Sequence, residues 1–175
     1  MALGRYENFP IAAHCVAFLI CGSPFKKVQR AIIDALYGLN QETYPLNSVI
    51  LSLRSDRVVS FEFGVAEGLV FNYLDSAEKE RLEKTVYRNS LPVLDFFCVI
   101  RYHTVKEGRK VPLRFDYQML RFTFEKNSIT LQIFHERGIQ RISFEDFVTF
   151  LVKRINIENA KHGLKPLKLK TLETR

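Results

Sequence analysis

The sequence contains no tryptophan, only two methionines and only three cysteines. Because the number of cysteines is odd and Cys15, Cys21 and Cys98 lie in apolar stretches, we expect reduced, buried thiols and no disulfide framework. Such thiols favour an intracellular location, in the cytoplasm or with the nucleoid or nucleus. No uncharged apolar run approaches the ~18 residues that span a bilayer, so we expect no membrane partner.

Sequence motifs for catalysis are also missing. The chain has no glycine-rich phosphate loop, no nucleophile elbow and no paired cysteines at metal-ligand spacing. His103, Asp116 and His135 could form an acid–base or metal site only if neighbouring strands brought them together. His135 and Glu136 are adjacent, so on a strand they point to opposite faces and do not readily share a metal. We therefore expect no cofactor and no metal, and we favour a non-catalytic protein while leaving enzyme activity open.

The composition is that of an ordinary folded domain. The chain has 175 residues, of which 47% are hydrophobic and 26% are charged, enough for one domain with a full core. Fifteen phenylalanines and seven tyrosines supply abundant aromatic surface. The formal net charge of +7 and the pI of about 9.4 permit an anionic partner such as nucleic acid, without establishing one.

The most regular apolar pattern lies between residues 113 and 133. Apolar residues alternate from Leu113 to Tyr117 and again from Leu120 to Phe124, but the second set is shifted by one position. Alternation that slips by one residue is typical of a β-bulge, which we place near Gln118 and Met119.

Residues 125–128 supply the turn that follows, and Asn127 tolerates the left-handed conformation. If Lys126 and Asn127 form the loop, three apolar pairs face each other across the hairpin: Phe124 with Ile129, Phe122 with Leu131, and Leu120 with Ile133. A shift of one residue would break all three pairs, so the sequence predicts this register.

Downstream of the hairpin, the pattern predicts a third strand and a helix. A turn over residues 136–138 leads to a short strand over 139–142. Ser143 is the expected N-cap, because two carboxylates follow in the first turn, near the positive end of the helix. Apolar residues then recur at three- and four-residue spacing, and Gly163 and Pro166 end the helix.

Apolar spacing and end signals predict the remaining elements. We expect a first helix capped by Ser23 and a second over 77–87 capped by Asp75 and Ser76, with strands over 49–53, 58–63, 69–74 and 93–102, the last near the middle of the sheet. Residues 11–20 are continuously apolar, which favours a strand and leaves a short helix open. Residues 103–110 are expected to form an exposed, mobile basic loop.

Together these patterns predict an α+β domain over residues 1–163, with a mostly antiparallel sheet and helices packed on one face. Hairpin-then-helix units occur twice. A duplication would divide the domain into pseudo-twofold halves, 23–90 and 91–160, whereas chance recurrence is the alternative. Residues 164–175 form a basic tail that we expect to be flexible.

One face of the predicted hairpin region is polar and basic. It carries Arg114, Arg121, Thr123, Thr130, Gln132, Phe134 and Arg141. Guanidinium groups hold phosphates and an exposed aromatic ring stacks on an unpaired base, so the sequence predicts a non-catalytic nucleic-acid-binding protein that favours single strands. Further backbone contacts would come from Lys106, Arg109 and Lys110 in the loop and from Lys165, Lys168 and Lys170 in the tail.

A protein–protein interaction subunit, or a homodimeric adaptor in a larger complex, is the alternative. The aromatic residues and the leucines of the tail would then be buried against a protein partner or a second copy. A third interpretation has no ligand at all, with polar cross-strand pairs facing water and Phe134 covered by a loop or a helix.

Overall fold

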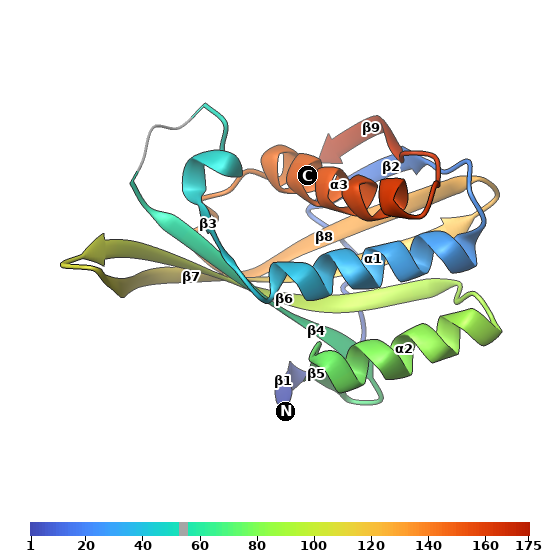
Figure 1. The fold of residues 1–175 in the computed structure, drawn as a ribbon, viewed down its shortest axis with the longest axis horizontal. Coiled ribbons are helices and arrows are strands. Elements are labelled where there is room, and N and C mark those ends of the chain that lie inside the picture. Colours follow the sequence, from blue (N-terminus) through green and yellow to red (C-terminus); the bar gives the residue numbers. More distant parts are fainter. Residues whose placement is uncertain (53–55) are drawn as a thin grey trace.

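The computed structural model describes residues 1–52 and 56–175, which form a mostly antiparallel sheet with three α-helices (Figure 1). The strands are β1 (Ala2–Arg5), β2 (Cys15–Ile20), β3 (Thr43–Pro45), β4 (Val58–Glu67), β5 (Val70–Tyr73), β6 (Val93–Lys106), β7 (Arg109–Glu125), β8 (Ser128–Gly138) and β9 (Lys168–Thr174). The helices are α1 (Phe25–Leu39), α2 (Ser76–Arg88) and α3 (Phe144–Lys161), with a short 3₁₀ helix, η1, at Leu46–Ser48.

One sheet contains the nine strands of the described residues. Its order is β1-β5-β4-β6-β7-β8-β2-β9, and β3 pairs with β4 beside this path. The α+β class is therefore confirmed, and β6 lies near the middle of the sheet as predicted. The two hairpin-then-helix units correspond to β4–β5–α2 and β7–β8–α3, and their duplication stays a prediction.

The hairpin of β7 and β8 has the predicted register. Its Cα partners include Phe124 with Ile129, Phe122 with Leu131, and Leu120 with Ile133, and all six side chains are buried. Lys126 and Asn127 form the turn with positive φ angles of 29° and 64°. Two residues of this conformation match the twist of the flanking strands, so turn and apolar pattern select the same register.

A bulge does occur next to residue 118, as predicted, but it lies on the neighbouring strand and does not cause the shift in apolar alternation. β7 pairs with β6 without a shift from Arg114 to Thr123, so the side chains of β7 alternate regularly there. The register between β7 and β8 does shift next to Tyr117, but the extra residue is Glu136 on β8. The apolar alternation shifts because Phe115 and Tyr117 lie on one face of the sheet, whereas Leu120 and Phe122 lie on the other.

Two further segments differ from the prediction. Residues 139–142 do not form a strand, because β8 ends at Gly138. β6, which precedes β7 in the chain, is instead the third strand of this meander. Residues 103–110 are not a loop, since β6 continues to Lys106 and β7 begins at Arg109.

The predicted N-caps of α2 and α3 are present. The carboxylate of Asp75 accepts a hydrogen bond of 2.9 Å from the backbone N–H of Glu78, and the hydroxyl of Ser143 accepts one of 3.1 Å from that of Asp146. Each satisfies one of the free N–H groups in the first turn of its helix. Gly163 follows α3 with a positive φ of 67°, a conformation that favours glycine and ends the helix.

Ser23 has a role other than the predicted cap of α1. No side chain caps α1, and the hydroxyl of Ser23 accepts a hydrogen bond of 3.1 Å from the backbone N–H of Lys165. Residues 168–174 then form β9, which pairs with β2 at the edge of the sheet. Residues 164–175 thus differ from the expected flexible tail, because β2 offers an unpaired edge that a short distant segment can complete.

The apolar segment 11–20 contains a strand, β2, as favoured. Of the strand predicted over 49–53, residues 49–52 form turns and a bend, and residue 53 lies outside the described residues. The other predicted elements occur in place, although β4 and β6 run further than the sequence indicated.

The sheet has two apolar faces with different covers. The first face, which carries Cys98, Ile100 and Leu120, joins apolar side chains of all three helices in one large core cluster. The second face, which carries Val99 and Met119, belongs to a smaller cluster with residues of the N-terminal segment, among them Tyr6, Phe9 and Ala13. The N-terminal segment 6–13 therefore covers part of the face that the sequence suggested was open.

Candidate functional site

Two strands extend beyond the rest of the sheet. β4 accompanies β6 as far as His103, and β8 accompanies β7 only from Asp116 onwards. Residues 104–115 therefore form a two-stranded arm, which projects from the body of the molecule in Figure 1. Every residue from Val105 to Phe115 is exposed, so the arm presents both of its faces to solvent.

The arm closes in a tight turn. Lys106 and Arg109 are Cα partners, and Glu107 and Gly108 between them have positive φ angles of 50° and 74°. A two-residue loop of this conformation continues the twist of the strands. The basic side chains that the sequence placed on a mobile loop are consequently held on paired strands.

An aromatic pair lies on the second face at the base of the arm. The ring centroids of Phe115 and Tyr117 are 4.8 Å apart with an interplanar angle of 31°. Phe115 is 40% exposed, whereas Tyr117 is half-buried, with its ring 5.4 Å from that of Phe97. Arg101 on β6 is the Cα partner of Phe115, and Arg137 on β8 is that of Tyr117. Because paired residues share a face, two rings lie between two arginines. We call Arg101, Phe115, Tyr117 and Arg137 the aromatic–arginine platform.

The arm is strongly basic. Residues 104–115 contain four cationic residues (Lys106, Arg109, Lys110 and Arg114) and one acidic residue, Glu107. Lys110 donates a hydrogen bond of 3.2 Å to the hydroxyl of Thr43, and Arg101 at the base pairs loosely with Glu62 at 3.4 Å. These contacts orient two cations without burying them, so the charge of the arm remains available to an anion.

His103 adds no charge to this surface. Its Nε2 lies 3.0 Å from the hydroxyl of Ser60 on the neighbouring strand. Burial lowers the pKa of His103 below its usual value, and the nearby charges of Lys110 and Arg101 lower it further. The imidazole is therefore neutral at pH 7.

Arg121 is on the second face, as predicted, but its guanidinium group is already occupied. It donates two hydrogen bonds of 2.7 Å to the carboxylate of Asp95 and one of 3.2 Å to the hydroxyl of Tyr6, and it lies over the ring of Phe9 at 4.8 Å. The hydrogen bonds to Asp95 are the main reason that the pKa of Arg121 is raised. Tyr6 in turn donates a short hydrogen bond to Asp95. Arg121 thus holds the N-terminal segment on the sheet.

Some of the predicted surface residues share a face and others do not. Arg121 is the Cα partner of Gln132, and Thr123 is that of Thr130, so these four residues lie together. Arg114 lies on the opposite face. It precedes Arg121 by seven residues, an odd number, and side chains alternate between the two faces along this regular strand. Its Cα partner on β6 is the buried Tyr102.

Phe134 shares the second face but is partly covered. Its ring stacks on that of His14, with centroids 4.4 Å apart and an interplanar angle of 16°. Arg141 is exposed and lies outside any strand, beyond the end of β8. The two residues therefore do not form one stacking site with Arg121.

The lysines of the C-terminal segment lie away from the arm. Lys168 and Lys170 are exposed on β9, which is separated from β7 by β8 and β2 in the sheet order. Lys165 precedes β9, and its backbone is tied to Ser23. The predicted basic residues thus occupy two regions, the arm and the β9 edge.

Asp116 and His135 do meet, whereas His103 does not join them. The carboxylate of Asp116 is fully buried and lies 3.0 Å from Nε2 of His135. It also accepts hydrogen bonds from the hydroxyl of Tyr102 at 2.6 Å and from the backbone N–H of Gln140 at 2.6 Å. Every bond of this carboxylate is internal, which is the arrangement of a structural polar cluster closed to a substrate.

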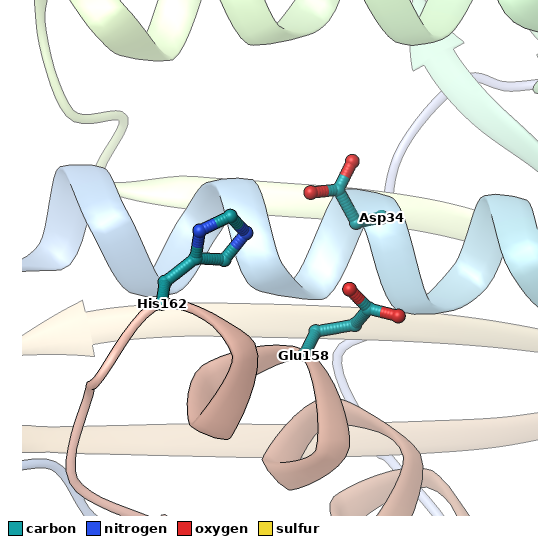
Figure 2. A group of neighbouring side chains, drawn as sticks. All are labelled: Asp34, Glu158 and His162. Atoms are coloured by element: carbon teal, nitrogen blue, oxygen red, sulfur yellow. The ribbon is translucent and has the colours of Figure 1, made fainter.

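A separate group of potential metal ligands lies between two helices (Figure 2). Asp34 on α1, Glu158 on α3 and His162 directly after α3 each bring one ligand atom within 4.8 Å of the others. The sequence patterns do not predict this group, because Asp34 is more than a hundred residues from Glu158 and His162 and only the packing of α1 on α3 brings them together.

The aromatic–arginine platform was also missed. Its signal is the alternation from Leu113 to Tyr117, which the predicted bulge would have placed on the same face as Leu120 to Phe124. A strand without a bulge places Phe115 and Tyr117 on the opposite face from Phe122 and Phe124, because side chains alternate along it.

Comparisons of the chain with protein-family models, with curated proteins and with solved structures found no match. Among the residues that the structure describes, none of the helices has the length and apolar character needed to cross a membrane.

Proposed function

We propose that this chain is a non-catalytic nucleic-acid-binding protein that holds a single strand on the aromatic–arginine platform and along the basic arm. The observation that carries the proposal is the ring pair of Phe115, which is exposed, and Tyr117, which is half-buried, between Arg101 and Arg137. Unpaired bases stack on such rings with about 1–3 kcal/mol each, and guanidinium forks bind the phosphates that flank them.

The arm supports the same ligand through its charge. Lys106 and Arg109 are partners on one side of the ribbon, and Lys110 lies on the other, so cations point in both directions. A phosphate backbone that leaves the platform can follow these side chains towards the tip. The exposed side chains of Val105, Val111 and Leu113 give the sugars and bases further contact area.

The remaining predicted residues take different parts in this proposal. Arg121 and Phe134 organise the surface rather than contact the ligand, because Asp95 and His14 occupy them. Arg141, Gln132 and the lysines of the C-terminal segment are secondary contacts for a longer strand. We also infer that the three helices cover the first face alone, which leaves the second face free beyond residues 6–13.

Fluorescence anisotropy with a labelled single-stranded oligonucleotide tests this proposal. With about four phosphate contacts, affinity should fall by about 1.5–2 decades between 50 and 200 mM salt, since single strands give a slope near −0.7 per contact. Phe115→Ala should weaken binding about 5–100-fold through lost stacking. Arg137→Ala should weaken it and flatten the salt dependence.

Matched controls separate these effects from general changes of surface. Leu69→Ala removes an apolar side chain that is 73% exposed in the β4–β5 turn, and Lys84→Ala removes a cation on α2. Both should leave affinity unchanged. Equal binding by wild type, Phe115→Ala and Arg137→Ala would refute the platform as the site, and absence of any salt-dependent binding would refute the function.

An interaction subunit is the second candidate, because the arm exposes four apolar side chains. Val105, Val111, Leu113 and Phe115 are between 37% and 49% exposed. A protein partner or a second copy would bury them. Light scattering of the wild type and of Leu113→Lys separates this alternative: a dimer that Leu113→Lys dissociates would favour the arm as a protein interface.

A further inference from the structure

The ligand group of Figure 2 has a defined local geometry. Glu158 and His162 are four residues apart at the C-terminal end of α3, so they lie above one another on one side of the helix. Asp34 comes from the middle of α1, which packs beside α3. Two helices therefore supply two carboxylates and one imidazole to a common point, with the ligand atoms within 4.8 Å of one another.

The carboxylates of this group have cationic neighbours. One oxygen of Asp34, Oδ1, is shielded from solvent and lies 3.3 Å from Nζ of Lys79, and the carboxyl group of Asp34 also shares a hydrogen bond with Glu83. Lys79 is shared with Glu83, 3.9 Å away. Glu158 pairs with Lys161 at 3.0 Å. Arg30 adds a further positive charge near Glu83. Asp34 and Glu158 therefore each have one ammonium group nearby, and a divalent ion held between the two carboxylates would compete with these ion pairs.

We propose that Asp34, Glu158 and His162 bind a divalent transition-metal ion of the Zn²⁺ type. Zn²⁺ takes histidine nitrogen and carboxylate oxygen at about 2.0–2.2 Å, so ligand atoms around it lie about 3.3–3.5 Å apart. Closing the group from 4.8 Å requires movements of about 1 Å, which rotation of the exposed His162 and the long Glu158 side chain supplies. A water molecule completes a four-coordinate shell.

The imidazole decides the class of metal. Mg²⁺ and Ca²⁺ prefer all-oxygen shells, whereas imidazole with carboxylates suits Zn²⁺ and its neighbours in the first transition row. The bound ion would fasten the end of α3 to α1. This site is separate from the arm and independent of nucleic-acid binding.

Isothermal titration of the purified chain with Zn²⁺, after treatment with a chelator, tests the proposal. We expect one ion per chain, and a visible spectrum with Co²⁺ that reports nitrogen ligation. His162→Ala and Glu158→Gln should each weaken Zn²⁺ binding at least about tenfold. Lys161→Ala should tighten it, because the ammonium group no longer competes for Glu158. A merely structural role of these residues does not predict that gain.

Two control variants test whether any loss of Zn²⁺ affinity is specific to the ligand group. His103→Ala removes a partly exposed histidine outside the group, and Glu80→Gln removes a helix carboxylate that also pairs with a lysine, Lys84. Neither should change the affinity. His162 is exposed after α3, so circular dichroism should show that His162→Ala keeps the fold. The proposal is overturned if Zn²⁺ does not bind stoichiometrically, or if His162→Ala binds it as tightly as wild type.

Discussion

The hydroxyl of Tyr102 donates a hydrogen bond of 2.6 Å to the carboxylate of Asp116, and neither side chain reaches solvent. The two residues lie on adjacent strands where the arm leaves the body of the sheet. Burial and this hydrogen bond raise the pKa of Tyr102, so the phenol stays protonated and remains a donor. The carboxylate also holds Gln140 and His135, and it thereby joins the base of the arm to the end of β8.

Replacing Asp116 by alanine should destabilise the fold strongly. The change leaves the Tyr102 hydroxyl and the Gln140 N–H buried without their acceptor, and the expected loss in the free energy of unfolding is about 3 kcal/mol or more. Tyr102→Phe removes one of these bonds and should cost about 1–2 kcal/mol. Urea denaturation measures both, and an Asp116→Ala variant as stable as wild type would contradict the role of this cluster.

Gly138 is expected to resist substitution for two reasons. Its φ is +118°, and a Cβ at this position would overlap the carboxylate of Asp116 and the backbone oxygen of Phe115. Gly138→Ala should therefore lower the free energy of unfolding by about 2–4 kcal/mol. Gly108→Ala is the matched control, because Gly108 has a φ of +74° with open space around it and should cost about 1 kcal/mol. Similar losses for the two variants, by thermal or urea unfolding, would argue against the overlap.

The contact of Arg121 with Asp95 should anchor the N-terminal segment. Arg121→Ala leaves Asp95 and Tyr6 without their cation, and we expect a loss of about 1–2 kcal/mol in stability. A double-mutant cycle with Asp95→Ala should give a coupling of at least about 1 kcal/mol. Hydrogen exchange near Tyr6 should accelerate in Arg121→Ala. Additive effects and unchanged exchange would show that the segment is held by its apolar contacts alone.

The buried Cys15 thiol predicts a loss of stability at alkaline pH. Burial raises its pKa from 9.0 to about 11, so between these values the unfolded chain releases a proton that the folded chain retains. Stability from this group is complete below pH 9 and should fall by about 1.4 kcal/mol per pH unit up to pH 11. Cys98 and Cys21 act in the same direction, because burial also raises their pKa values.

Cys15→Ala isolates the contribution of this thiol. Denaturation at pH 8, 9 and 10 should show a shallower fall in the variant than in wild type. A parallel pH dependence of the two proteins would mean that Cys15 titrates at an ordinary pKa in the folded state.

Several features were predictable because they depend on nearby residues. The Lys126–Asn127 turn and the three apolar pairs beside it agree on one register, and Asp75 and Ser143 are followed by the free N–H groups that they cap. Each of these choices is decided within a few residues, by turn conformation, by alternation or by helix-end hydrogen bonding. The hairpin from residue 120 to 133 is the clearest case.

Other features depend on partners that are distant in the sequence. Alternation shows that Arg121 and Phe134 share a face, but not that Tyr6, Phe9 and His14 cover it. Likewise, Phe115 lies on an exposed arm only because β4 and β8 stop short of residues 104–115. The hydrophobic effect is non-directional, so a local apolar pattern predicts which side chains are buried but not which distant segment packs on them.

The sequence by itself determined the α+β class, the register of the β7–β8 hairpin and the caps of two helices, since short-range sterics and hydrogen bonds decide them. Only the tertiary structure decided that residues 104–115 form an arm, that Arg121 is an anchor, and that Asp34 meets Glu158 and His162. These depend on which strands end early and which helices pack together, and that is settled by the whole chain at once.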